Sequence, residues 1–103
     1  MKKEETKFKE RVLCELEKLS LWAEKIQQVS IRGTPDILIC ANGTFVALEL
    51  KTDVGVLSAL QEYKLSCIRE TGGIAIVSTP KSWPKDLETI KKIVNSRPTK
   101  SKV

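Results

Sequence analysis

Residues 31–51 read IRGTPDILICANGTFVALELK, and this stretch decides the fold. It contains two short apolar runs, Ile37–Ala41 and Thr44–Leu50, which are joined by Asn42-Gly43. Asn-Gly between two such runs favours a type I′ turn, because both central residues of that turn need a positive φ. The stretch therefore predicts a β-hairpin with a two-residue turn, and the turn length fixes which residues face each other.

The predicted register places two carboxylates opposite each other, Asp36 before the first strand and Glu49 near the end of the second. Facing Cβ atoms in a hairpin lie roughly 4.5–5.5 Å apart, so like charges at such positions destabilise the pair. Lys51 follows Glu49 by two residues and points to the same face. Two carboxylates beside an ammonium group suit a hard cation, with the Leu50 carbonyl as a further oxygen ligand.

The same residues also have a purely structural interpretation. Lys51 and Glu49 could form an ion pair at a solvated strand end, with Asp36 serving a turn after Pro35. In the metal-site interpretation, the cation acidifies water and stabilises charge on a phosphodiester. Lys51 would position or deprotonate that water, or stabilise the developing negative charge. The apolar strands around the two acids favour the metal site.

Helical and strand patterns flank the hairpin in the sequence. The flanking segments are, in chain order, a helix over Glu4–Leu19, a strand over Leu21–Val29, a helix over Ser58–Thr71, a strand over Ile74–Ser78 and a helix over Lys85–Val94. The last strand follows a helical crossover and is expected to pair in parallel with the second hairpin strand. This order predicts an α/β fold with a mixed β-sheet flanked by helices on both faces.

Five short motifs follow one another in a characteristic order: Gly33–Asp36, Glu49–Lys51 after twelve intervening residues, Ser58, Leu60-Gln61 and Gly72-Gly73. Their order and spacing resemble the VRR-NUC branch of the PD-(D/E)XK nuclease superfamily, above all its small stand-alone phage and bacterial forms. The resemblance implies the αβββαβ core of that superfamily, here with an extra C-terminal helix. It also implies divalent-metal-dependent hydrolysis of DNA phosphodiesters. Stand-alone members are similar to Holliday junction resolvases and tend to be homodimers that act on branched DNA.

The resemblance implies a role for each matched residue. Asp36 and Glu49 would be ligands of Mg²⁺ or Mn²⁺, and Lys51 would be the catalytic lysine. Gln61 would match the glutamine that supports the active site from the following helix. With Ser58 it also completes a capping box, so its side chain could serve only to satisfy a backbone N–H.

Glu5 would match the acidic residue of the first helix, which contacts the metal site directly or through water. It precedes Phe8 by three residues, so it continues the apolar stripe backwards and is expected on the core-facing side. It could instead be only a favourable acid at a helix N-terminus. Glu10 is the alternative acid on this helix, and its place on the solvated flank argues against it.

The composition fits a protein that acts on a polyanion. The 103 residues include 18 Lys and Arg against 13 Asp and Glu, and the net charge of +5 favours nucleic acid as a partner. The absence of histidine excludes Ser-His and Cys-His catalysis and histidine-ligated zinc. Cys14, Cys40 and Cys67 show no CxxC spacing and predict reduced, buried thiols.

The chain shows neither a signal peptide nor an apolar run near 18 residues, which predicts a cytoplasmic protein with no membrane partner. We expect one nuclease domain over residues 1–95, followed by a basic, disordered tail over residues 96–103, and no small-molecule cofactor. Two other functions stay open. One is a non-catalytic nucleic-acid-binding module with a nuclease fold, and the other is a protein-interaction module whose positive charge is incidental.

Overall fold

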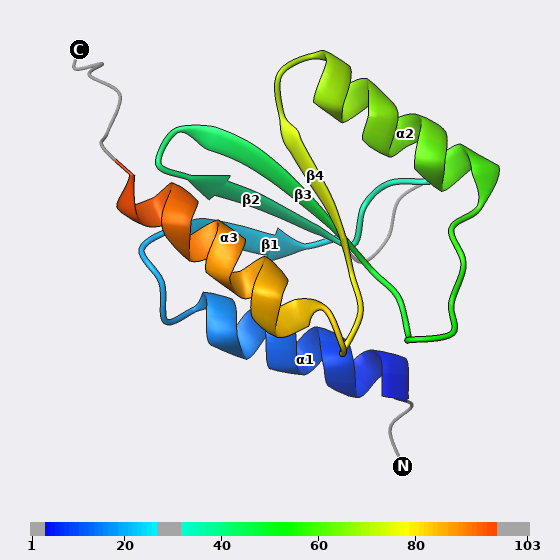
Figure 1. The fold of residues 1–103 in the computed structure, drawn as a ribbon, viewed down its shortest axis with the longest axis horizontal. Helices are drawn as coiled ribbons and strands as arrows, with labels where there is room; N and C mark the ends of the chain where they lie inside the picture. Colours follow the sequence, from blue (N-terminus) through cyan, green and yellow to red (C-terminus); the bar gives the residue numbers. More distant parts are fainter. Residues whose placement is uncertain (1–3, 27–31, 97–103) are drawn as a thin grey trace.

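The computed structural model describes residues 4–26 and 32–96, which form a four-stranded mixed β-sheet with helices on both faces (Figure 1). The helices are α1 (Glu4–Leu16), α2 (Ala59–Glu70) and α3 (Trp83–Asn95), and the strands are β1 (Trp22–Lys25), β2 (Ile37–Ala41), β3 (Thr44–Leu50) and β4 (Ile74–Ser78). The predicted α/β class, the αβββαβ order and the extra C-terminal helix are confirmed. Among the described residues, no helix has the length and apolar character needed to span a membrane.

The hairpin of β2 and β3 has the predicted turn and register. Asn42 and Gly43 have φ angles of 53° and 78°, as a type I′ turn requires. Ala41 pairs with Thr44 and Ile37 with Leu48. The strands are ordered β1-β2-β3-β4, with the first two pairings antiparallel and the β3–β4 pairing parallel. The hairpin therefore lies in the centre of the sheet, and the crossover through α2 is parallel as predicted.

The main hydrophobic core lies between one face of the sheet and helices α1 and α3, which run side by side under it in Figure 1. Phe8, Val12 and Leu16 recur every four residues on α1 and are all buried. The side chains of the core are Phe8, Val12, Leu16, Ile37, Ile39, Ala41, Val46, Leu48, Leu50, Trp83 and Ile90. Trp83 is fully buried, and its indole Nε1 donates a hydrogen bond of 2.9 Å to Glu15.

The opposite face of the sheet is only partly covered, because α2 packs on β4 and leaves the β1–β2 side open. Trp22, Cys40 and Phe45 share a row across β1, β2 and β3, and all three are exposed. The prediction of buried thiols was wrong: Cys14 and Cys40 are exposed and Cys67 is half-buried. Cys40 is exposed because it points to the uncovered face.

Several element boundaries differ from the sequence prediction. Helix α1 ends at Leu16 rather than Leu19, and α3 begins at Trp83, two residues before the predicted start. The earlier start of α3 places Pro84 in the first helical turn, where its missing N–H has no intrahelical partner to lose. The predicted strand over residues 21–29 is shorter. Residues 27–31, and the predicted tail beyond Ser96, lie outside the described residues.

Candidate active site

Asp36 joins the beginning of β2 to the end of β3. The residue directly precedes β2, and continuing the hairpin register by one step places it opposite Glu49. Its Oδ2 atom accepts a hydrogen bond of 2.8 Å from the backbone N–H of Leu50. Since Pro35 before it is buried, the backbone around Asp36 is held in place. The structure thus brings together the two carboxylates that the turn chemistry predicted to meet.

Glu49 is a buried carboxylate, with 3% of the residue exposed. Its Oε2 atom accepts a hydrogen bond of 2.9 Å from Gln61 Nε2 and lies 3.7 Å from the Lys51 ammonium nitrogen. Burial, and then the negative charge of Asp36, raise the pKa of Glu49 to about 7. Lys51 and Lys9 act in the opposite direction but do not cancel these effects. Burial and the neighbouring charge of Asp36 therefore favour the protonated form of Glu49 in the metal-free protein.

The structure gives Gln61 both a capping contact with Ser58 and a hydrogen bond to Glu49. Its Oε1 atom accepts a hydrogen bond of 2.9 Å from the backbone N–H of Ser58, whose hydroxyl oxygen accepts one of 3.1 Å from the N–H of Gln61. This is the predicted capping box at the beginning of α2. The amide nitrogen remains free to donate to Glu49, because the acceptor and donor ends of an amide are separate atoms. The cap therefore orients the side chain that holds Glu49.

The predicted core-facing position of Glu5 was wrong. The stripe that packs on the sheet repeats every four residues back from Leu16 through Phe8, so it continues to Glu4 rather than Glu5. Glu5 and Glu10 are both exposed. Within residues 4–26 and 32–96, no group of three or more Asp, Glu, Cys or His side chains is placed to hold a metal ion. A role for Glu5 at the predicted metal site stays a prediction.

Lys9 is a site residue that the sequence reasoning missed. Its ammonium nitrogen lies 3.3 Å from Oδ1 of Asp36, the oxygen that the Leu50 N–H does not occupy. Lys9 follows the buried Phe8 directly on α1, so the packing of that helix brings it to Asp36 at the beginning of β2. No local pattern could have indicated this contact, because it joins side chains 27 positions apart along the chain.

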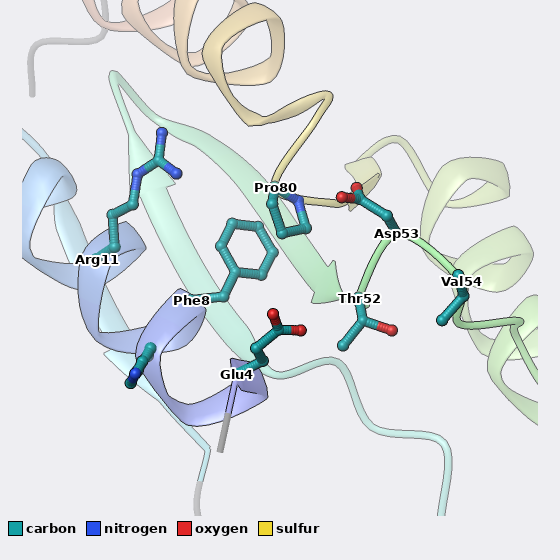
Figure 2. Close-up of a pocket in the computed structure, with 8 residues that line it drawn as sticks. Glu4, Phe8, Arg11, Thr52, Asp53, Val54 and Pro80 are labelled. Atoms are coloured by element: carbon teal, nitrogen blue, oxygen red, sulfur yellow. The ribbon is translucent and has the colours of Figure 1, made fainter. Parts of the chain in front are cut away.

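A cavity of about 340 Å³ lies between α1 and the segment that follows β3 (Figure 2). Figure 2 shows the Phe8 ring pointing toward Pro80 inside it. The cavity is lined by Glu4, Lys7, Phe8, Arg11, Thr52, Asp53, Val54 and Pro80. It contains neither of the two carboxylates, and its charged lining residues have both signs. The paired acids, and not this cavity, are the candidate active site.

The donor set of the site fits a hard divalent cation. Asp36 and Glu49 supply carboxylate oxygens, and the negative charge of Asp36 is the second cause, after burial, of the raised pKa of Glu49. Mg²⁺ in proteins is usually held by one or two carboxylates, with water and substrate phosphates completing its shell. Two acids are therefore sufficient, and a third protein carboxylate is not needed.

A comparison with solved structures finds a nuclease. Hjc from Archaeoglobus fulgidus, a Holliday junction resolvase from an archaeal hyperthermophile, matches with a TM-score of 0.55 and 26% sequence identity. The match covers 74% of this chain and 69% of Hjc. No protein-family model and no curated protein matches the chain. The chain thus has a nuclease-like α/β fold, as the resemblance to PD-(D/E)XK nucleases predicted.

Proposed function

We propose that this chain is a divalent-metal-dependent endonuclease that hydrolyses phosphodiester bonds of DNA and is selective for branched DNA such as four-way junctions. The observation that carries the proposal is the buried Glu49 carboxylate, held by Gln61 and Lys51 next to Asp36. The similarity to Hjc and the net charge of +5 support it. The finer assignment rests on the sequence motifs. It is a VRR-NUC-like nuclease in the cytoplasm of a bacterial or phage-infected host cell.

Each residue of the site has a distinct task in this proposal. Asp36 and Glu49, with the Leu50 carbonyl, would hold Mg²⁺ or Mn²⁺. When bound, the cation supplies positive charge that stabilises the phosphodiester transition state. Lys51 positions or deprotonates the attacking water, or stabilises the developing negative charge. Gln61 fixes the orientation of the Glu49 carboxylate through its 2.9 Å hydrogen bond.

The proposed partner and assembly follow from the substrate. One active site per chain cuts one strand, and symmetric cleavage of two strands of a junction requires two sites related by a two-fold axis. We therefore propose a homodimer on branched DNA. Analytical ultracentrifugation of the protein with and without a four-way junction tests this assembly, and a monomer in both states would contradict it.

The test of the activity is a cleavage panel with four-way-junction, flap, duplex and single-stranded DNA in Mg²⁺ or Mn²⁺. Cleavage is expected to be strongest on branched DNA, and to be abolished by chelator and by Lys51→Ala. Lys91→Ala is the matched control, because Lys91 lies on α3 in an exposed pair with Glu88. A chain that cuts none of the substrates, or whose cleavage survives Lys51→Ala, is not the proposed enzyme.

One observation favours the alternative of a non-catalytic DNA-binding module. Both acids already have a lysine partner, Lys9 for Asp36 and Lys51 for Glu49, so the site is partly neutralised without a metal. Such a module would bind DNA with a steep dependence on salt and release no product. Titration with Mn²⁺ by calorimetry separates the two functions, because a binding module has no need of a metal site.

A further inference from the structure

The two oxygens of the Asp36 carboxylate have partners of different kinds. Oδ2 accepts a hydrogen bond of 2.8 Å from the Leu50 backbone N–H, which belongs to the central strand and cannot move away from the site. Oδ1 lies 3.3 Å from the Lys9 ammonium nitrogen, which is the tip of a long side chain from another element. One oxygen is therefore fixed by the fold, while the other has a partner that can leave.

The two lysines of the site also differ. Lys51 comes from the same strand end as Glu49, and its position follows from the alternation of side chains along β3. Lys9 reaches the site from α1, and 31% of its side chain is exposed. A half-exposed ion pair of this kind contributes little to the stability of a fold. The fold does not need Lys9 at Asp36, so the contact calls for a different explanation.

We propose that Lys9 is an exchangeable cation at the metal site, which neutralises Oδ1 of Asp36 in the metal-free protein and binds a DNA phosphate once a divalent cation occupies the site. This inference rests on the proposed function. A lysine ammonium group is a strongly hydrated point charge on a flexible stem, and it binds phosphate well. After leaving Asp36, Lys9 stays within reach of the site, because its backbone is held on α1 next to the buried Phe8.

If Lys9 exchanges between Asp36 and DNA, the substitution Lys9→Met should strengthen the binding of Mn²⁺ and weaken the binding of DNA. Lys9→Met keeps most of the apolar stem and removes the charge that competes with metal for Asp36. Its affinity for Mn²⁺, measured by calorimetry, is expected to rise about two- to fivefold. Lys7→Met is the matched control, because Lys7 is an exposed lysine on the same helix, and its affinity for Mn²⁺ should equal that of the unsubstituted protein.

DNA binding provides the second readout, and it does not depend on turnover. Binding of a labelled four-way junction is measured by fluorescence anisotropy in chains that also carry Lys51→Ala, so that the DNA stays intact. With EDTA, Lys9→Met should bind as tightly as its parent, because Lys9 is then engaged by Asp36. With Mn²⁺ it should bind about tenfold more weakly. The slope of log Kd against log salt concentration should be smaller by about 0.9, which corresponds to the loss of one phosphate contact.

Unchanged Mn²⁺ affinity of Lys9→Met would overturn the inference, and so would an equal loss of DNA affinity in EDTA and in Mn²⁺. The proposed function fails separately. If the unsubstituted protein binds Mn²⁺ and cuts junctions while Lys9→Met matches it in both titrations, only the role of Lys9 is wrong. If the unsubstituted protein neither binds Mn²⁺ nor cuts DNA, both the nuclease and the exchange are wrong.

Discussion

Replacing Glu49 by Gln is expected to remove a pH dependence of folding from the metal-free protein. The pKa of Glu49 is raised from 4.5 to about 7, first by burial and next by the negative charge of Asp36. The folded state therefore holds this proton more tightly than the unfolded state does. The contribution of Glu49 to the free energy of unfolding is therefore largest below about pH 4.5, and it is lost as the pH rises to about 7.

The size of the effect follows from the shift. Each pKa unit corresponds to about 1.36 kcal/mol, so the change from 4.5 to about 7 amounts to about 3 kcal/mol. Only 4% of the Glu49 side chain is exposed, which leaves little room for screening by solvent. A Gln oxygen at this position can still accept the Gln61 N–H, but it carries no titrating proton. The variant should exceed the stability of the original protein by less than about 1 kcal/mol at pH 5 and by about 3 kcal/mol at pH 8.

The assay is urea denaturation with EDTA at several pH values from 5 to 8. The chain has no histidine, so few other groups titrate in this window. Glu62→Gln, which changes an exposed acid on α2, is the control and should show no such difference. Asp36→Asn should move the midpoint of the Glu49 transition to lower pH, because the second cause of the shift is removed. An advantage of the Glu49→Gln protein that is equal at pH 5 and pH 8 would refute the reasoning.

Two further substitutions test individual hydrogen bonds of the structure. Gln61→Glu keeps an acceptor for the Ser58 N–H but sets a carboxylate against Glu49, so the free energy of unfolding should fall by ~1–2 kcal/mol at pH 8 and by less at pH 5. A loss that is the same at both pH values in urea denaturation would argue against this contact. Asp86→Ala leaves the buried Ser78 hydroxyl without its 2.6 Å acceptor and should cost ~1–3 kcal/mol, measured by thermal unfolding. An unchanged melting temperature would contradict the importance of this bond.

The resemblance and the structure agree on the fold and differ on one helix. The motifs from Gly33 to Gly73 predicted the order of elements, and the match to Hjc confirms a nuclease-like fold. The expected acid of the first helix, Glu5, is exposed, while Lys9 from the same helix lies at Asp36. A basic residue therefore stands near the carboxylates where the family pattern led us to expect an acidic one.

The sequence by itself determined the hairpin and its pair of acids. A two-residue Asn42-Gly43 turn permits one register, and the strict alternation of side chains then places Asp36 opposite Glu49 with Lys51 on the same face. The capping box of Ser58 was predictable for the same reason, since its bonds span three residues. These features depend on local geometry, which a short stretch of chain carries within itself.

Only the tertiary structure decided what surrounds the acids. The rotation of α1 about its own axis is set by the packing of Phe8, Val12 and Leu16 on the sheet, and that rotation brings Lys9 to Asp36 and exposes Glu5. The burial that raises the pKa of Glu49 likewise comes from neighbouring elements. Such contacts join residues far apart in the chain, so their formation depends on the packing of whole elements and not on any local pattern.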